Sequence, residues 1–291
     1  MTRGIGLSSA AFVLALIVAG CKESGSSPSP GALKINGSTT VNLPAAEAAE
    51  VLRAERKMNI QVDTQGGSSG GISMLGDGLV QIGMISKHVA DDDRKKYPKV
   101  NFKETQIGED AVALIVSKDV WDGGLRSLSK QQAKAIYEGK ITHWKDVGGP
   151  DLRIAFFNKE PGRGTWEVFV HWVYGSPKKA PPVSFPEVGG NEETRNKVAS
   201  TRGALSQLSS SWADQRTVFA LALKDDAGAL VDPTAANIAT GKYPMSRPLF
   251  LLTNGEPTGD AKTFIDFLLS DRGQELVAKH GYLRLKDLKP H

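Results

Sequence analysis

The sequence predicts an α/β fold with mostly parallel sheets, and two observations carry that prediction. Strand signals alternate with helix signals along most of the chain, which is typical of parallel α/β architectures. One strand candidate, Ala111–Val116, is a continuous apolar run of the kind found in strands buried on both faces. The 291 residues suffice for two modest domains, and a composition that is 40% hydrophobic and 23% charged excludes wholesale disorder and a polytopic membrane protein.

The N-terminus has the layout of a secretory signal peptide over residues 1–20. Arg3 supplies a positive start, Ala10–Val18 supply an apolar stretch, and the small residues Ala19 and Gly20 precede a potential cleavage site. The next residue, Cys21, is the only cysteine of the chain and cannot form an internal disulfide. An uncleaved anchor helix and a plain signal followed by an incidental cysteine are the alternatives.

The predicted domain starts near Leu33, after a flexible tether over residues 21–32 that is rich in Ser, Gly and Pro. The segment 44–56 is rich in Ala and Glu and favours a helix, whereas 60–64 alternates in polarity as a half-buried strand does. In this half, the predicted strands are Leu33–Asn36, Ile60–Thr64, Gln81–Ile85 and Ala111–Val116, and the predicted helices are Pro44–Arg56 and Gly70–Leu75.

The second half continues the alternation of strands and helices. Ser129 and Gln132 fit a capping box at a helix start, and Gly281 suits the left-handed position that follows a last helix. The predicted strands are Arg153–Phe157, Thr217–Leu223 and Leu249–Thr253, and the predicted helices are Ser129–Tyr137, Thr165–Tyr174, Ala261–Leu269 and Gln274–Lys279.

Three loops rich in Gly, Ser and Thr lie where a predicted strand ends and a helix begins: Asn36–Thr40, Gly66–Gly71 and Gly162–Thr165. In open α/β sheets, ligands bind at such junctions. Unpaired backbone N–H groups and the positive end of the helix dipole favour an anion there, and small residues let it approach the backbone closely. Each loop alone could be an ordinary cap or tight turn. Three in one chain predict an anion site.

The order of these motifs resembles the phosphate-binding component of bacterial phosphate ABC importers. The resemblance rests on Asn36–Thr40, Gly67–Gly71, Ile82–Ser86 and Lys159-x-x-x-Arg163-Gly-Thr165. Three further segments agree with it: Ile136–Lys140, Trp144–Val147 and Tyr243–Pro248. It extends from about Leu33 to Tyr282.

The resemblance implies a two-domain periplasmic-binding-protein fold, with two crossing segments and an anion in the cleft between the domains. The expected boundaries are 33–115 with 250–291 for domain I, and 116–249 for domain II. Hinge closure about crossings near Val112–Ser117 and Leu249–Thr253 would enclose inorganic phosphate. The expected partner is the permease of an ABC importer, and sulfate or molybdate is the alternative ligand.

Carried over residue by residue, the resemblance implies that Ser38, Thr39, Ser68, Gly164 and Thr165 donate hydrogen bonds to the anion. Four more candidates fall where this chain departs from the family pattern or only resembles it: Ser86, Asp110, Lys159 and Arg163.

Two of these departures concern positive charge. Lys159 stands where the family usually has an arginine, so a bidentate fork is lost there. Arg163 stands where the family commonly has serine and could restore the fork, or it could be a solvated arginine at a helix start.

The other two departures concern the group that accepts the phosphate proton. Ser86 occupies the position of the family's proton-accepting carboxylate. We expect Asp110 to take that role, with a structural cap as its alternative.

The sequence Val18-Ala19-Gly20-Cys21 resembles the lipobox of bacterial lipoproteins. This implies cleavage before Cys21 and lipid on its thiol, so that the protein is anchored on the periplasmic or cell-surface side of a bacterial membrane.

Other functional classes have weaker support. Gly66–Gly70 matches the G-x-S-x-G nucleophile elbow of hydrolases, but no partner histidine is evident for Ser68. The histidines lack metal-ligand spacing, so we expect no cofactor, no metal and no enzymatic activity. Nucleic-acid binding is not expected, a monomer is, and a non-transport phosphate sensor with the same fold stays open.

Overall fold

The computed structural model describes residues 1, 31–225 and 227–288. Cys21 and nearly all of the predicted signal peptide and tether lie outside the described residues. From Ala32 onward the chain forms one compact unit. None of the described helices is long and apolar enough to cross a membrane.

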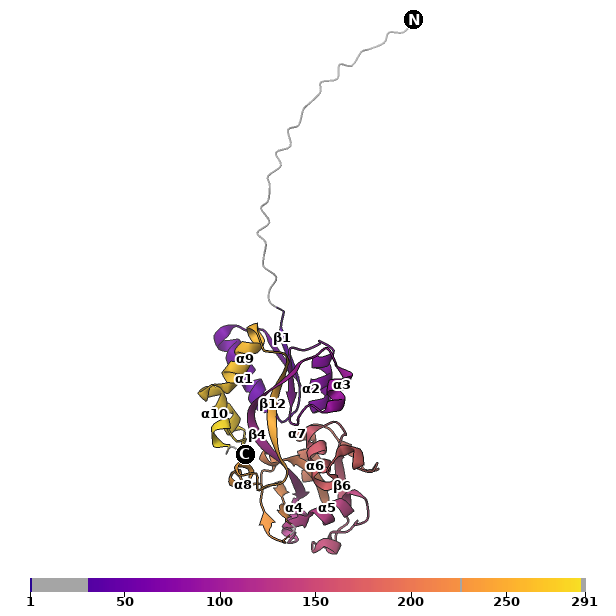
Figure 1. The fold of residues 1–291 in the computed structure, drawn as a ribbon. Helices are drawn as coiled ribbons and strands as arrows, with labels where there is room; N and C mark the ends of the chain where they lie inside the picture. The colour runs from indigo at the N-terminus through magenta and orange to yellow at the C-terminus, as the bar shows by residue number, and fades with distance from the viewer. Residues whose placement is uncertain (2–30, 226, 289–291) are drawn as a thin grey trace. The chain divides into compact units, whose positions relative to one another are not determined.

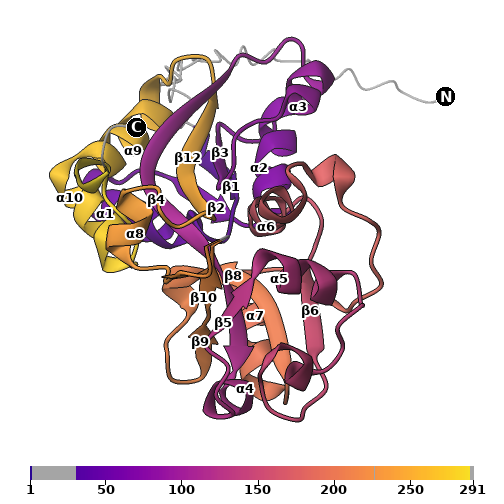
Figure 2. The ribbon, with the colours of Figure 1, turned by 60° about the horizontal axis from the view of Figure 1, so that its bottom comes forward.

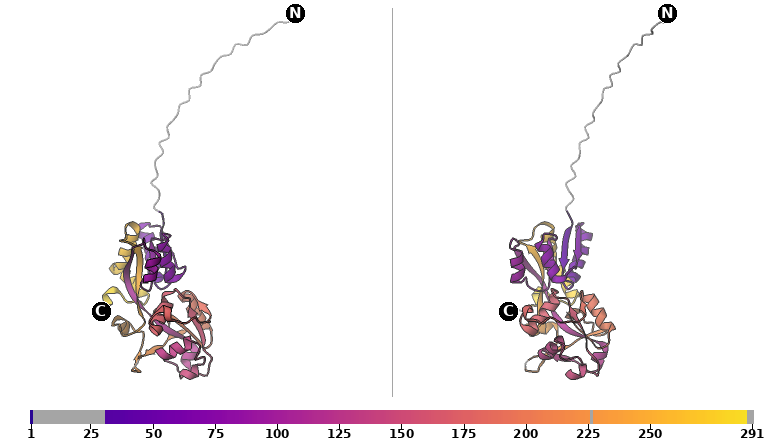
Figure 3. Two further views of the ribbon diagram at one scale, coloured as in Figure 1. Left: turned by 45° about the vertical axis from the view of Figure 1, so that its right-hand side comes forward. Right: turned by 90° about the vertical axis from the view of Figure 1, so that its right-hand side faces the viewer.

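Two lobes make up this unit, and two long strands, β4 (Phe102–Ser117) and β12 (Ser246–Asn254), run between them (Figures 1 and 2). Two further views show the same division (Figure 3). We call the lobe that contains the first and the last of the described elements the first lobe. Its other elements are β1 (Leu33–Gly37), α1 (Asn42–Arg56), β2 (Ile60–Asp63), α2 (Gly67–Gly76), β3 (Ile82–Ile85), α3 (Asp91–Lys96), α9 (Gly259–Leu269), α10 (Asp271–Lys279) and the 3₁₀ helix η4 (Leu285–Asp287).

The second lobe is formed by the chain between the two long strands. Its strands are β5 (Ser127–Ser129), β6 (Ala155–Lys159), β7 (Glu187–Val188), β8 (Ala204–Ser209), β9 (Val218–Ala220), β10 (Ala222–Lys224) and β11 (Leu230–Val231). Its helices are α4 (Lys118–Asp122), α5 (Lys130–Tyr137), α6 (Gly164–Tyr174), α7 (Asn191–Ser200) and α8 (Ala235–Ala239), with 3₁₀ turns η1 (Trp144–Val147), η2 (Pro177–Lys179) and η3 (Ser210–Trp212).

The main sheet follows the order β2-β1-β3-β12-β4-β8-β6-β7, and β9 also pairs with β4. The pairs β1–β2, β1–β3, β6–β8 and β6–β7 are parallel, as predicted for a chain in which helices connect strands. However, β12 runs antiparallel to β3 and β4, and β4 runs antiparallel to β8 and β9. The sheet is therefore mixed rather than mostly parallel, because the two connecting strands run against their neighbours.

The strand β4 exchanges partners as it passes from one lobe to the other. Residues 102–111 pair with β12, whereas 112–117 pair with β8 and β9. Ala111, Val112, Leu114 and Val116 pack into one hydrophobic cluster of the second lobe, while Ala113 and Ile115 pack into another on the opposite face. Burial on both faces explains why 111–116 is a continuous apolar run.

Each lobe has its own hydrophobic core. In the first lobe, α1, α9 and α10 cover one face of the sheet, and their apolar residues cluster with Ile35, Met84 and Leu251. The other face packs against α2, through Ile72 and Leu75. The larger core of the second lobe includes Trp144, Tyr137 and Phe169. Helices on both faces leave the ends of the strands in the first lobe open to the second lobe.

Some predicted elements differ in detail. The apolar segment 217–223 is not one strand: it is divided into β9 and β10 because the chain leaves β4 after Leu221 and pairs with β5. The capping box of Ser129 and Gln132 is confirmed, with reciprocal hydrogen bonds of 2.9 and 3.1 Å. Gly281 is left-handed, with φ of 80°, one residue beyond the C-cap of α10.

Candidate functional site

A small polar cavity lies between the lobes. Three strand–helix junctions of the first lobe meet two helix N-termini of the second lobe there. The cavity is lined by Ser38, Thr39, Thr40, Gly67, Ser68, Ser86, Lys159, Arg163, Gly164, Thr165, Gly189 and Asn191. It thus brings together every predicted ligand residue except Asp110.

Glycines allow the loops of the first lobe to reach this position. Gly66 and Gly67 have φ of 73° and 59°, in the left-handed region that favours glycine, and they turn the chain from β2 into α2. The α2 N-terminus places Ser68 in the cavity, where its Oγ accepts a hydrogen bond of 3.1 Å from the backbone of Ser86. Ser38 Oγ donates to Ser86 Oγ at 3.1 Å. These serines thus form one buried group of hydroxyls.

The second lobe contributes the N-termini of α6 and α7. Helix α6 begins with Gly164 and Thr165, both buried at the cavity. Helix α7 begins with Asn191, directly after Gly189 and Gly190. Because the first N–H groups of a helix lack intrahelical acceptors and carry partial positive charge, both helices favour an anion in the cavity.

Arg247, on β12, lies directly behind the cavity and is 1% exposed. Its Nη1 donates to Thr165 Oγ1 at 3.0 Å and to Ser86 Oγ at 3.3 Å. Its Nη2 donates to Thr40 Oγ1 at 3.0 Å. One guanidinium therefore holds hydroxyls from both lobes. Arg247 was not among the predicted site residues, although it is the one charged residue of β12 and belongs to the segment 243–248 that carried the resemblance.

Asp110 is fully buried, but it does not line the cavity. Its Oδ2 accepts hydrogen bonds from Arg247 Nε at 3.1 Å and Nη2 at 2.8 Å, and its Oδ1 accepts from Ser209 Oγ at 3.0 Å. Burial raises the pKa of Asp110, while Arg247 and Ser209 oppose that shift. The structure thus places Asp110 behind the cavity, where its carboxylate orients Arg247.

Lys159 ends β6 and is 1% exposed. Its Nζ donates to the carbonyl oxygens of Gly189 and Gly190 at 2.7 and 3.0 Å and lies 3.5 Å from Asn191 Oδ1. Burial, followed by the neighbouring cations Arg163 and Arg247, holds the pKa of Lys159 well below its ordinary value. Lys159 therefore fixes the turn that leads into α7.

Arg163 precedes α6 and reaches across the cavity toward the first lobe. Its Nε and Nη2 pair with Glu160 Oε2 at 2.9 and 2.7 Å. Its side chain is 16% exposed and lies so close to Gly67 that a Cβ there would be 2.7 Å from Arg163 Cδ. It is therefore a partly buried, paired cation at the edge of the cavity rather than a solvated one.

Direct contacts join the lobes around the cavity. Asn191 Nδ2 donates to Thr40 Oγ1 at 3.0 Å, and Ser69 Oγ donates to the carbonyl of Gly162 at 2.8 Å. The two lobes are thus in direct contact around the site. Asn191 and Thr40 were not predicted as site residues. Thr40 is the last residue of the motif Asn36–Thr40. Asn191 could have been found because it follows the pair Gly189-Gly190 and precedes two glutamates, a pattern typical of a helix start.

The alternative chemistries find little support in this cavity. Ser68 contacts Ser86, and the described residues that line the cavity include no histidine. No group of three or more potential metal ligands is present among the described residues.

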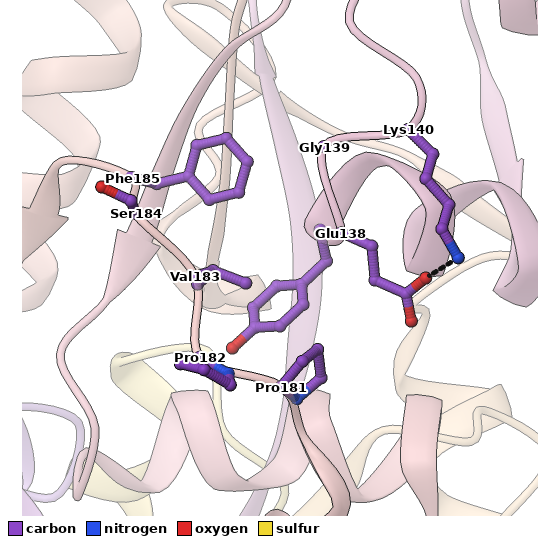
Figure 4. Close-up of a pocket in the computed structure, with 9 residues that line it drawn as sticks. Glu138, Gly139, Lys140, Pro181, Pro182, Val183, Ser184 and Phe185 are labelled. Atoms are coloured by element: carbon purple, nitrogen blue, oxygen red, sulfur yellow. Dashed lines mark ion pairs between the residues drawn. The ribbon is translucent and has the colours of Figure 1, made fainter.

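A larger hollow in the second lobe is lined by Tyr137, Glu138, Gly139, Lys140, Pro181, Pro182, Val183, Ser184 and Phe185 (Figure 4). Its lysine is paired with Glu138 at 2.6 Å, and that carboxylate disfavours an anion there.

Comparison with known proteins agrees with this geometry. Residues 22–272 match the model of the PBP superfamily domain. The chain is 32% identical to the Phosphate-binding protein PstS of Bacillus subtilis (strain 168), over 96% of this chain and 93% of that protein. It is 28% identical to the Phosphate-binding protein PstS of Staphylococcus haemolyticus, over 90% of this chain and 86% of that protein.

Solved structures give the same result. A phosphate ABC transporter substrate-binding protein with bound phosphate from Clostridium perfringens superimposes with a TM-score of 0.77 and 30% identity, covering 87% of this chain and 99% of that chain. An ABC-type phosphate transport receptor from Vibrio cholerae gives a TM-score of 0.68 and 26% identity, over 89% and 100% of the respective chains.

Proposed function

Because the chain belongs to the PBP superfamily and, within it, to the family of phosphate-binding proteins, we propose that it binds inorganic phosphate between its lobes. The observation that carries this proposal is the convergence of six hydroxyl-bearing residues, two helix N-termini and the buried Arg247 on one small cavity. Charge-assisted hydrogen bonds from such donors are roughly twice as strong as neutral ones, which suits a multiply charged oxyanion.

Each part of the site has a distinct role in this proposal. The hydroxyls of Thr39, Thr40, Ser68 and Thr165 and the start of α6 at Gly164 donate hydrogen bonds to the phosphate oxygens. Ser38 and Ser86, expected from the resemblance to be ligands, support these donors instead, because Ser38 Oγ already donates to Ser86 Oγ and Ser86 Oγ lies 3.3 Å from Ser68 Oγ. Arg163 and Lys159 contribute positive charge from the second lobe. Asp110 serves the site indirectly, because both of its oxygens already accept hydrogen bonds from other side chains.

Transport requires that the ligand be released, so the lobes must also open. We propose that the two domains, 33–115 with 250–291 and 116–249, move about the connecting strands β4 and β12. Phosphate favours the closed form because it contacts donors of both lobes only there. The open form would deliver phosphate to the permease of an ABC importer. Small-angle scattering should report a smaller radius of gyration with phosphate than without it.

We further propose that the protein acts as a monomeric binding protein and not as an enzyme, and that lipid on Cys21 anchors it outside the cytoplasmic membrane. Cys21→Ser should release the protein from the membrane fraction while leaving phosphate affinity unchanged. An unmodified N-terminus on membrane-bound protein, seen by mass spectrometry, would contradict the anchor.

Calorimetry of residues 22–291 with phosphate, sulfate and molybdate tests the binding proposal. We expect one phosphate per chain. Thr165→Val should weaken binding at least tenfold, since it keeps the shape of the side chain and removes one donor. If the protein binds none of these anions, or if it hydrolyses a phosphate ester at a rate that Ser68→Ala abolishes, the proposal is wrong.

A further inference from the structure

The hydroxyl of Thr40 can only donate a hydrogen bond to a ligand. A threonine hydroxyl has one hydrogen and two lone pairs. Its Oγ1 accepts from Arg247 Nη2 at 3.0 Å and from Asn191 Nδ2 at 3.0 Å. Both lone pairs are therefore occupied, and the hydrogen that remains is free to point into the cavity that Thr40 lines.

The amide orientation of Asn191 follows from Lys159. An ammonium group donates hydrogen bonds and cannot accept them. Because Lys159 Nζ lies 3.5 Å from one amide atom of Asn191, that atom must be the oxygen. The amide NH₂ group then faces Thr40, so the donation to Thr40 is fixed by a neighbouring charge.

Ser86 is saturated in the same way. Its Oγ accepts from Ser38 Oγ at 3.1 Å and from Arg247 Nη1 at 3.3 Å. Its own hydrogen is therefore donated to Ser68 Oγ, at 3.3 Å. Thr165 Oγ1 accepts from the same Nη1 at 3.0 Å, which occupies one of its lone pairs. Arg247 thus contributes to the direction of three hydroxyls that line the cavity.

Arg247 is itself fully engaged. A guanidinium has five N–H groups. Three of its hydrogen bonds go to Thr40, Ser86 and Thr165, and its Nε and Nη2 also donate to Asp110. The carboxylate that could accept the proton of a phosphate P–OH group is therefore sequestered behind the arginine. No described carboxylate lines the cavity.

We propose that Arg247 is a positioning residue that sets anion selectivity: it holds Thr40 and Thr165 as donors to the anion and Ser86 as a donor to Ser68, so the cavity accepts fully ionised oxyanions such as sulfate alongside phosphate. This proposal rests on the proposed binding of a tetrahedral oxyanion. A P–OH group finds only neutral hydroxyls here, such as Thr165, which keeps one free lone pair, and a hydroxyl that can accept from phosphate can equally donate to sulfate. Nothing in the cavity repels sulfate.

The test is a competition experiment at one fixed pH, with labelled phosphate displaced by unlabelled phosphate or sulfate. For the unaltered protein we expect the Kd of sulfate to lie within about a hundredfold of that of phosphate, because the neutral hydroxyls impose only a modest penalty on either anion. Arg247→Lys keeps a cation but loses the fork, which frees lone pairs that can accept the P–OH proton. Both anions should bind more weakly, and the ratio of the sulfate Kd to the phosphate Kd should rise at least about fivefold.

Two further variants keep the test independent of folding. Asn191→Ala frees one lone pair of Thr40 and should raise the ratio in the same direction. Tyr243→Phe removes a buried hydrogen bond of 3.1 Å to the carbonyl of Val112, away from the cavity, and should leave the ratio unchanged. A merely structural role for Arg247 would weaken both anions equally.

The outcomes are distinct. If the unaltered protein does not bind phosphate, the proposed function fails. If it binds phosphate but sulfate is weaker by more than about a hundredfold, or if the ratio stays constant in both Arg247→Lys and Asn191→Ala, the proposal about Arg247 is overturned while the proposed function stands.

Discussion

Lys87 and Glu167 form an ion pair between the lobes, with 2.6 Å between Nζ and Oε1 and exposed side-chain fractions of 7% and 24%. Lys87 follows β3 in the first lobe, and Glu167 belongs to the first turn of α6 in the second lobe. If the lobes open as proposed, this pair is broken, so we expect it to stabilise the closed form specifically. Burial raises the pKa of Glu167, and Lys87 opposes this shift.

We predict that Glu167→Gln weakens phosphate binding about tenfold, mainly by faster dissociation. The substitution removes the nearer of the two carboxylates beside the buried Lys87 ammonium and leaves only Asp93, at 3.9 Å, and weakening a buried pair in this way is destabilising. Stopped-flow measurement of phosphate release, together with calorimetry, checks both parts of the prediction.

Asp92 and Lys178 provide a matched control for this prediction. They also form an ion pair between the lobes, but their side chains are 57% and 77% exposed. Exposed pairs contribute little because solvent screens them, so Asp92→Asn should change the affinity less than twofold. Equal effects of the two substitutions would show that burial of the pair is not what matters.

Gly164 is predicted to be the position where a single methyl group prevents closure. A Cβ at Gly164 would lie 2.5 Å from Ser86 Oγ and 2.9 Å from Ser68 Oγ, both of which belong to the first lobe. In the proposed open form, Gly164 would move away from both serines and the clash would be absent. Gly164→Ala should therefore reduce phosphate affinity at least about a hundredfold while leaving the midpoint of thermal unfolding without ligand nearly unchanged.

Gly190→Ala is the control for Gly164→Ala. It adds the same methyl group to the same lobe near the cavity, but the new Cβ would meet only Thr39 Cγ2, at an ordinary 3.5 Å. We expect a change in affinity of less than about threefold. Tight binding by Gly164→Ala would mean that the closed arrangement is not the binding form.

Lys159 should make the stability of the folded protein depend on alkaline pH. Its pKa lies well below 10.5 in the folded protein, mainly because of burial, and returns to the ordinary value on unfolding. Between these two values the unfolded chain binds one more proton than the folded protein. The free energy of unfolding should then rise with pH by about 1.4 kcal/mol per unit, and this rise should end near the ordinary pKa of lysine.

Urea unfolding at a series of pH values measures this effect. Lys159→Met should abolish the rise, whereas Lys242→Met, at an exposed lysine, should not. Parallel curves for Lys159→Met and the unaltered protein would show that Lys159 keeps its proton in the folded state.

The sequence predicted those parts of the fold and the site that depend on local patterns. Strand and helix positions follow from periodicity and caps, and the glycine-rich junctions follow from the chemistry of anion binding. The apolar run 111–116 indicated a buried strand, but periodicity cannot show that β4 continues back to Phe102 and changes partners at its middle. The antiparallel direction of β4 and β12 is likewise a property of the whole sheet.

The role of Arg247 could not be predicted from local signals. Its partners Thr40, Ser86, Asp110 and Thr165 are separated from it by 82–207 positions and come from both lobes and from a neighbouring strand. The sequence therefore offered Asp110 as a proton acceptor, because nothing in the sequence places an arginine opposite it. Only the register that pairs Arg247 with Asp110 on adjacent strands shows that the carboxylate is already engaged.

That pairing leads to a last prediction, for Asp110→Asn. An asparagine can still accept one hydrogen bond from Arg247, but the buried guanidinium loses its counter-charge. Breaking a buried pair in this way costs about 3–5 kcal/mol, so the free energy of unfolding without ligand should fall by a large fraction of that amount.

A bound anion restores a negative charge beside Arg247. Phosphate should therefore bind Asp110→Asn more tightly than it binds the unaltered protein, and at one fixed phosphate concentration it should raise the unfolding free energy of Asp110→Asn by more. Ser209→Ala, which removes a hydrogen bond to Asp110 but no charge, should lower stability by only about 1 kcal/mol and leave the effect of phosphate unchanged. If Asp110 instead accepted the phosphate proton, Asp110→Asn would abolish phosphate stabilisation while barely changing the stability of the free protein, which is the opposite pattern.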